Sequence, residues 1–282
     1  MSNSIENPDH LINSELGKKS EYLTQYSPSL LFPISRQSKR DEINIAQPLP
    51  FYGYDVWNHY EVSWLNMKGK PMVAIAEIAY SCDSVNIIES KSMKLYFNSF
   101  NQTKFASSEA IAAIIKQDIA ERVQGDVSVT IRTLPCDKTL FAISELSGLC
   151  IDTLDVECSV YQTDASLLKT RENHVNETVY SNLLKSNCLV TFQPDWASVQ
   201  ISYEGKQIIH ESLLQYLVSF RNHNEFHEQC IERIFMDIMR HCQPKSLTVL
   251  GRYTRRGGLD INPLRSTQPV DGAIKNSRLE RQ

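Results

Sequence analysis

The sequence predicts an α+β fold in which one module of strands and helices occurs twice. Segments rich in β-branched residues, or with an apolar residue at every second position, indicate strands, and apolar residues three or four positions apart indicate helices. In each half of the chain these segments follow the order β-β-α-β-β. The pattern Y-x-x-S-F begins at Tyr96 and again at Tyr216, an offset of 120 residues. A repeat of this length indicates two copies of a whole module and not a solenoid.

The first half begins with a lead-in. The first 47 residues contain scattered Ser, Asn and Pro with little periodicity, and we expect them to be extended or irregular. Residues 72–80 predict a strand, residues 86–97 a further segment with polar residues on one side, and residues 126–134 an alternating strand. Residues 109–123 predict a helix, because their isoleucines fall at helical spacing and a serine just before them can act as the N-cap.

The second half repeats a similar order of elements. The patterns predict strands at residues 179–184 and 198–203, helices near 212–220 and 226–241, and strands at 247–253 and 259–262. The expected organisation is therefore an N-terminal lead-in at residues 1–47, a first module at 48–165 and a second module at 166–282.

The charge balance argues against a nucleic-acid partner. The 282 residues contain 29 Lys and Arg against 33 Asp and Glu, so the net charge is −4 and no overall basic field is available for a phosphate backbone. No apolar run approaches the ~18 residues of a membrane span, and the first 40 residues lack the apolar core of a signal peptide. We expect a soluble cytoplasmic protein with no membrane and no nucleic-acid partner.

The cysteines and glycines narrow the possible chemistry. The seven cysteines include no C-x-x-C pair, and we interpret them as reduced thiols, most of them in the core. The ten glycines form neither a G-x-G-x-x-G turn nor a P-loop, so any nucleotide has to bind in another way.

Cys188 and Asp195 form the first candidate catalytic pair. They are seven residues apart, and Gln193-Pro194 between them can turn the chain so that both side chains reach one pocket. A cysteine supplies a soft nucleophile once ionised, and an aspartate in apolar surroundings beside Trp196 can stay protonated and act as an acid. A buried core cysteine followed by a turn aspartate remains the alternative.

Polar residues at unmatched positions of the two halves suggest one composite site. Residues 89–92 (E-S-K-S) precede the repeat tyrosine in the first half only, and His227-Glu228 follow Phe226 in the second half only. Glu228 falls in the first turn of a predicted helix, where a carboxylate suits recognition of an N–H-rich planar base and Phe226 can stack on it. The alternative is that this glutamate only favours the start of the helix.

Two further clusters have residue types that bind charged ligands. His223, His227 and Cys230 are spaced for zinc, but the order H-N-E-F-H differs from H-E-x-x-H, and a fourth ligand has to come from elsewhere. Residues 252–260 contain three arginines before a glycine pair, which suits an anion such as a 2′-phosphate, with lysines of the first half able to complete the site. A solvated hairpin turn is the alternative for this segment.

Four segments together resemble the NADPH-dependent 7-cyano-7-deazaguanine reductases, the QueF nitrile reductases of queuosine biosynthesis. These segments are E-S-K-S-x-K-x-Y from Glu89, C-x6-D from Cys188, F-H-E from Phe226 and R-R-G-G from Arg255. The resemblance covers most of the chain from about residue 52 onward and corresponds to the longer, two-module form of the family.

The resemblance implies a tunnelling fold of two tandem β-β-α-α-β-β modules whose sheets join in a barrel-like assembly, usually in a homodimer. It implies that Cys188 attacks the nitrile carbon to give a covalent thioimide, and that Asp195 delivers a proton to the nitrogen. Two NADPH then supply two hydrides in turn, by way of an imine, to the primary amine 7-aminomethyl-7-deazaguanine, with no metal. The resemblance assigns deazaguanine contacts to Ile88, Glu89, Ser90, His227 and Glu228, and NADPH contacts to Ser90, Lys91, Arg256 and Gly257.

Two other functions stay open at this point. A zinc-dependent pterin-type hydrolase shares this fold and uses Cys and His ligands, so a metal analysis separates it from a reductase. A non-catalytic purine-binding module binds a ligand without turning over NADPH.

Overall fold

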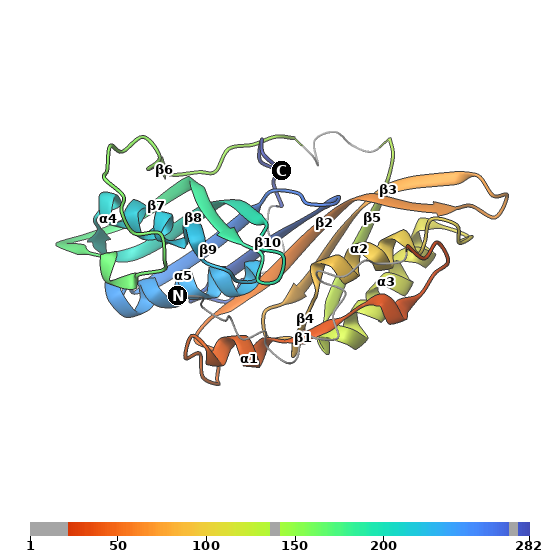
Figure 1. The fold of residues 1–282 in the computed structure, drawn as a ribbon, viewed down its shortest axis with the longest axis horizontal. Helices are drawn as coiled ribbons and strands as arrows, with labels where there is room; N and C mark the ends of the chain where they lie inside the picture. Colours follow the sequence, from red (N-terminus) through yellow and green to blue (C-terminus); the bar gives the residue numbers. More distant parts are fainter. Residues whose placement is uncertain (1–21, 136–141, 271–275) are drawn as a thin grey trace, which may run out of the picture.

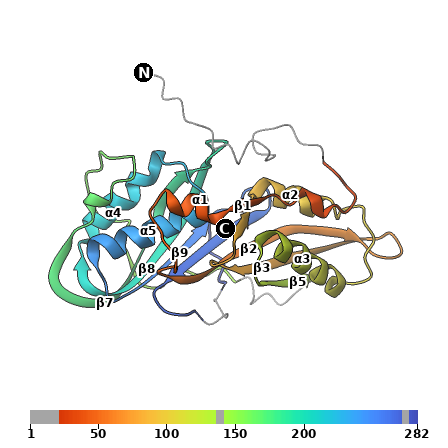
Figure 2. The same ribbon diagram turned by 90° about the horizontal axis from the view of Figure 1, so that it is seen from below.

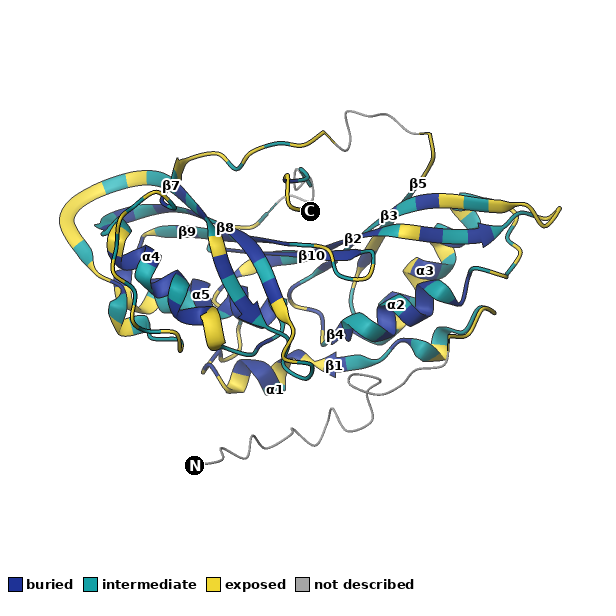
Figure 3. Ribbon diagram, turned by 45° about the horizontal axis from the view of Figure 1, so that its top comes forward, coloured by how far each residue is buried: buried dark blue, intermediate teal, exposed yellow. Residues whose placement is uncertain are grey.

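The computed structural model describes residues 22–135, 142–270 and 276–282. Its main feature is a sheet of eight strands in the order β5-β3-β2-β10-β9-β8-β7-β6 (Figure 1). Helices α2 to α5 all cover the same face of this sheet, as Figure 2 and Figure 3 show from two directions. The α+β class predicted from the sequence is confirmed.

The first half of the chain supplies one end of the sheet. Its elements are strands β2 (Tyr52–Leu65), β3 (Pro71–Ser81) and β5 (Val127–Thr133) and helices α2 (Ser90–Asn98) and α3 (Ser108–Val123). The predicted strands at 72–80 and 126–134 and the helix at 109–123 are confirmed. The segment 86–97 contains two elements, because the short strand β4 (Asn86–Ile88) ends just before α2 begins.

Helix α3 illustrates how the local sequence fixes an element. The Ser107 hydroxyl caps it by accepting a hydrogen bond from the Ala110 amide at 3.2 Å. Ile111, Ile115 and Ile119 lie four positions apart and are all fully buried against the sheet. Within the described residues, none of the helices combines the length and the apolar character that crossing a membrane requires.

The second half supplies the other end of the sheet, and its predicted strands and helices are all confirmed. They are β7 (Thr170–Asn187), β8 (Pro194–Ile208), α4 (His210–Ser219), α5 (His227–Cys242), β9 (Ser246–Tyr253) and β10 (Leu259–Ser266). The two-residue strand β6 (Leu149–Cys150) pairs in parallel with β7. Short 3-10 turns lie at Pro28–Leu30, Ala165–Leu167 and Phe220–Asn222.

The two halves join along strands β2 and β10. These strands pair antiparallel over eight residue pairs, from Leu259 opposite His59 to Ser266 opposite Tyr52, so one continuous sheet runs through both halves. One apolar cluster lies mainly in each half, between helices and strands, but the cluster of the second half also includes Phe51 and Cys82, and that of the first half includes Leu259 and Ile261 of β10. The seam is therefore the place where side chains of both halves can meet.

The expectation that the first 47 residues are extended or irregular is wrong for residues 33–41. Strand β1 (Pro33–Ser35) pairs with β4 in a separate two-stranded sheet, and helix α1 (Arg36–Asp41) follows directly. The reason lies in distant charges, because Arg36 pairs with the buried Asp55 of β2 and Arg40 pairs with the buried Glu232 of α5. A buried carboxylate needs such a partner, so this segment is part of the folded core.

Candidate active site

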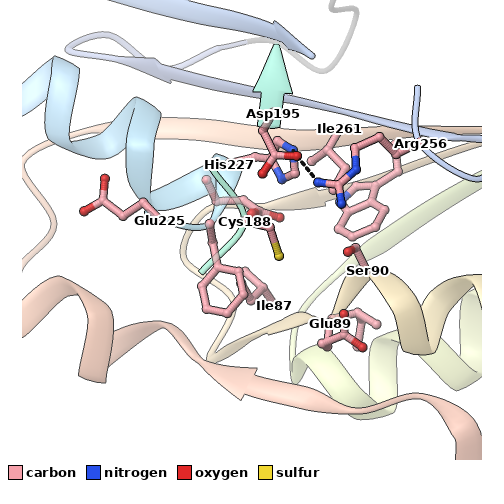
Figure 4. A pocket seen from close by; sticks show the side chains of 13 residues that line it. Ile87, Glu89, Ser90, Cys188, Asp195, Glu225, His227, Arg256 and Ile261 are labelled. Carbon is pink, nitrogen blue, oxygen red and sulfur yellow. Dashed lines mark hydrogen bonds and ion pairs between the residues drawn. The ribbon is translucent and has the colours of Figure 1, made fainter. Parts of the chain in front are cut away.

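A cavity lies at the seam between the halves and is lined by residues of both (Figure 4). From the first half come Trp57, Ile87, Ile88, Glu89 and Ser90; from the second come Cys188, Asp195, Glu225, Phe226, His227, Glu228, Arg256 and Ile261. Eight of the ten site residues that the sequence singles out therefore meet here, while Lys91 and Gly257 do not line this cavity. We call it the thiol cavity.

Cys188 begins the tight loop between β7 and β8. Its amide donates to the Gln193 carbonyl at 2.8 Å, and the Phe192 amide donates back to the Cys188 carbonyl at 3.1 Å. The loop closes with Phe192 in the left-handed region, at φ 57°. The next loop residues, Leu189 and Val190, pack against apolar side chains of β1 and β4. These contacts hold the Cys188 sulfur within the thiol cavity (Figure 4).

Asp195 is 2% exposed and lies between the side chains of Arg256 and His227. The Arg256 guanidinium donates to its carboxylate, and His227 Nε2 lies 3.5 Å from its Oδ1 (Figure 4). Burial alone would raise the pKa of this carboxyl, but the charges and hydrogen bonds of His227 and Arg256 outweigh burial and lower it. The sequence-based expectation of an aspartate in apolar surroundings is therefore wrong, because Arg256 and His227 flank Asp195 and its lowered pKa favours the carboxylate form.

Glu228 presents a different electrostatic situation. It is 4% exposed in the first turn of α5, and its Oε1 has no hydrogen-bond partner among the described residues. Burial, assisted by the negative charge of Asp55, raises its pKa from 4.5 to about 7. A buried carboxyl with an unused acceptor beside a cavity is typical of a group that bonds to a ligand.

Glu89 caps helix α2. Its two carboxylate oxygens accept hydrogen bonds from the Lys91 and Ser92 amides at 2.6 and 2.7 Å, and its own amide donates to the Phe32 carbonyl at 2.9 Å. Burial raises the pKa of Glu89 despite these bonds. The same carboxylate that anchors the helix therefore also lines the thiol cavity.

A second, basic cavity adjoins the first. It is lined by Ser90, Lys94, His227, Thr254, Arg256, Leu259 and Ile261, of which Ser90, His227, Arg256 and Ile261 line both cavities. Gly257 lies beside it with φ 58°, and a Cβ there would come within 3.0 Å of the Lys94 Cδ. A glycine thus keeps the turn close to two cationic side chains, so the residues fit a phosphorylated cofactor. Lys91 lines neither cavity.

Several cavity residues were missed by sequence reasoning. Glu225 is buried and accepts hydrogen bonds from Arg233, while its amide donates to the Asn187 carbonyl at 3.1 Å. His223 and Arg233 outweigh the effect of burial and lower the Glu225 pKa. Glu225 thereby fixes the chain before α5 against the segment that leads into the Cys188 loop. In the sequence, only its position directly before F-H-E pointed to a role in the site. Trp57 was missed because strand β2 was not predicted.

The zinc interpretation does not match the local structure. Helix α5 begins at His227, so His223 lies on the preceding turn and not on the same helix as Cys230. His223 Nε2 instead lies 3.1 Å from the Glu225 carboxylate. Across the described ranges, no group of three or more His, Cys, Asp or Glu side chains is placed to share a metal ion.

The fold and the two adjoining cavities define the class of this protein. A thiol and an unsatisfied buried carboxyl that line one cavity, next to a second, basic cavity, are typical of an enzyme active site.

Comparisons with known proteins give the family. A family model described as "Nitrile reductase, 7-cyano-7-deazaguanine-reductase N-term" matches residues 22–131, and one described as "QueF-like protein" matches residues 194–271. An NADPH-dependent 7-cyano-7-deazaguanine reductase of Legionella pneumophila (strain Lens) is 58% identical over 272 residues, which cover 95% of each chain. One from Ralstonia nicotianae is 56% identical over 97% of this chain and its own full length.

A solved structure of the archaeosine synthase QueF-Like in the apo form covers 36% of this chain and 99% of its own, with 14% identity and a TM-score of 0.30. On the strength of the sequence relatives, the chain belongs to the family of NADPH-dependent 7-cyano-7-deazaguanine reductases. It is an oxidoreductase that uses NADPH. This assignment replaces the zinc-dependent hydrolase and the non-catalytic purine-binding module considered from the sequence.

Proposed function

We propose that this enzyme reduces the nitrile of 7-cyano-7-deazaguanine to the primary amine through a thioimide on Cys188, with Asp195 as the proton donor, in queuosine tRNA modification. The observation that supports this most is the meeting of Cys188, Asp195 and the unsatisfied Glu228 in one cavity. We further propose a metal-free cytoplasmic homodimer, with residues 48–165 and 166–282 as the two modules that share the site.

Recognition of the deazaguanine ring falls to carboxylates from both halves. The ring presents N–H donors along its edge, and an ionised Glu228 offers a buried acceptor that no protein group uses within the described residues. Glu89, from the first half, has accepting capacity beyond its two bonds to the α2 amides. Ile88 and Ser90 border the ring beside Glu89, and His227 borders it beside Glu228.

The atoms and charges of the thiol addition balance when Asp195 starts as a carboxylate. The Cys188 sulfur forms a bond to the nitrile carbon, one π bond of the C≡N group breaks, and the nitrogen takes a proton. Because the resting carboxylate is ionised, it accepts the thiol proton first and then gives it to the nitrogen. The product has the combined mass of protein and nitrile, since no group leaves.

The reduction needs two hydrides and two protons. NADPH supplies the hydrides one at a time, which takes the thioimide to an imine with release of the Cys188 sulfur, and the imine to the amine. Asp195 gives one proton to the nitrogen at each reduction. Ser90 and Arg256, which line the basic cavity together with Lys94, would hold the cofactor, with Gly257 beside the cavity and Lys91 outside it completing the contacts.

Mass spectrometry of the intact protein tests this proposal. Incubation with the nitrile but no NADPH should add the full mass of 7-cyano-7-deazaguanine, and Cys188→Ala should remove the adduct. Cys230→Ser is the matched control, because Cys230 is fully buried, and burial raises the pKa of its thiol to about 12. An adduct that survives Cys188→Ala, or that maps to Cys230, contradicts the proposal.

A further inference from the structure

Arg256 lies where the thiol cavity and the basic cavity meet, and it lines both. One terminal nitrogen of its guanidinium donates to the Asp195 carboxylate and the other donates to the Gln193 side-chain carbonyl. One arm therefore reaches Asp195, which lines the thiol cavity (Figure 4), and the other reaches Gln193 at the end of the Cys188 loop. An anion in the basic cavity has to compete for this guanidinium with Asp195 and Gln193.

The two members of this ion pair differ in their freedom to move. The Asp195 side chain is 1% exposed and fixed at the start of β8, whereas the Arg256 side chain is 29% exposed on the turn after β9. A partly exposed arginine can reorient, and its planar fork suits phosphate at least as well as a carboxylate. Any change in the pair will therefore come from the arginine.

The other charged groups around Asp195 remain when Arg256 moves. Besides Arg256, the groups that interact electrostatically with the Asp195 carboxylate are His227 of α5, Lys94 of α2, Lys185 of β7 and Tyr253 of β9. The Lys94 ammonium is itself drawn to an anion in the basic cavity, which it lines together with Arg256. An anion in the basic cavity thus reduces the attraction of both Arg256 and Lys94 for the Asp195 carboxylate. Burial of Asp195 is unchanged and continues to favour its protonated form.

We propose, building on the proposed function, that Arg256 is a positioning residue that acts through Asp195 and couples binding of the cofactor phosphate to proton uptake at this carboxylate. A phosphate in the basic cavity draws Arg256 away, and the released Asp195 takes one proton from solvent. That proton then passes to the substrate nitrogen as the hydride adds to carbon, so the substrate gains two electrons and NADPH becomes NADP⁺.

This coupling matches the stoichiometry of the reaction. Reduction of a nitrile to an amine consumes one proton with each hydride, and once Asp195 has passed the thiol proton to the nitrogen it needs a new proton for each of these two steps. If the same binding event that brings the hydride also releases Asp195, the proton is loaded once for each cofactor bound.

Calorimetry of NADP⁺ binding tests the coupling without turnover. Titrations between pH 5 and 8, in buffers with different enthalpies of ionisation, give the number of protons taken up on binding. The native protein should take up more protons than Asp195→Asn, by up to one for each site. The 2′-phosphate titrates in both proteins, so the difference isolates Asp195. Equal proton uptake in the two proteins at every pH, or no binding of NADP⁺ to the native protein, overturns the inference.

Infrared difference spectra supply a second measurement. A carboxylic acid band should appear when NADP⁺ is added to the native protein at pH 7. The band is assigned to Asp195 if it does not appear when NADP⁺ is added to Asp195→Asn. Arg256→Ala should show this band without NADP⁺. Arg240→Ala is the matched control, because Arg240 of α5 lines neither cavity and donates to the Ile43 carbonyl at 2.9 Å, and this variant should behave as the native protein.

The outcomes also separate this inference from the proposed function. If the nitrile adduct forms on Cys188 but the Asp195 band does not respond to NADP⁺ or to Arg256→Ala, only the coupling is wrong. If the band responds but no adduct forms on Cys188, the coupling stands and the thioimide mechanism is wrong.

Discussion

Replacing Glu228 with Gln should strengthen the fold and weaken substrate binding, and both effects should depend on pH. Glu228 ionises near 4.5 in the unfolded chain and at about 7 in the fold. As the pH rises through this window the unfolded state releases the proton first, so the native protein loses stability. The loss is complete above about pH 7 and amounts to about 3 kcal/mol for a pKa change of this size.

Urea unfolding at pH 5 and pH 8 measures this effect. The free energy of unfolding of Glu228→Gln, relative to the native protein, should increase by up to about 3 kcal/mol between the two pH values. Glu225→Gln is the matched control. The Glu225 pKa lies below its usual range, so Glu225 is ionised above pH 5 in both the folded and the unfolded chain. The difference in unfolding free energy between Glu225→Gln and the native protein should therefore stay constant. A constant difference for Glu228→Gln as well would refute the electrostatic assignment.

Binding of 7-cyano-7-deazaguanine to a Cys188→Ala background measures the functional side without adduct formation. An N–H donor on the ring bonds better to an ionised carboxylate, so affinity should fall about tenfold for each pH unit below the Glu228 pKa of about 7. Loss of a hydrogen bond to a charged group costs about 1.5–3 kcal/mol, so Glu228→Gln should weaken binding about 10- to 150-fold at pH 8. A dissociation constant that is the same at pH 6 and pH 8 would mean that Glu228 does not contact the ring.

Three further predictions concern other parts of the site and the seam. Asp195→Asn should lower turnover by ~10²- to 10⁴-fold with little loss of substrate affinity, and a steady-state assay showing near-native turnover would leave Asp195 without a role in proton transfer. Glu89→Gln should reduce the discrimination against a ring analogue that lacks the exocyclic amino group, as measured by competitive binding; unchanged discrimination would remove the first half from ring recognition. Arg265→Met should destabilise the fold by about 3–5 kcal/mol in urea unfolding, because Asp55 and Glu232 both lose a buried partner, and a change below 1 kcal/mol would contradict this.

Helices α3, α4 and α5 and most of the described strands could be predicted because their information is local, whereas α1 and α2 were not predicted as helices. Isoleucines four apart and an N-cap serine define α3 without reference to the rest of the fold. The catalytic candidates were also found locally, since Cys188 and Asp195 are seven residues apart with a turn between them. The meeting of Glu89 with Glu228 was inferred from polar residues that one half has and the other lacks, and both line the thiol cavity.

Strand β2 and residues 33–41 could not be predicted because they bury polar groups. Asp55, Asn58 and His59 of β2 are all buried and interrupt the alternation by which a strand is recognised. Their burial is possible through partners that lie far away in the sequence, as when Asp260 accepts a hydrogen bond from Asn58 at 2.8 Å. From the sequence, Arg36 and Arg40 are likewise expected at the surface, because their buried partners Asp55 and Glu232 lie far away in the chain.

The same distant charges determine the chemistry of the site. Asp55 is held ionised inside the protein because Arg265 and Arg36 outweigh its burial and lower its pKa. Its fixed negative charge adds to the burial of Glu228 and moves the pKa of that carboxyl toward neutrality. Arg36 comes from α1 and Arg265 from β10, the strand that joins the halves. A motif can therefore identify Glu228 as a binding residue, but the pH at which it becomes an acceptor is set by residues that no motif contains.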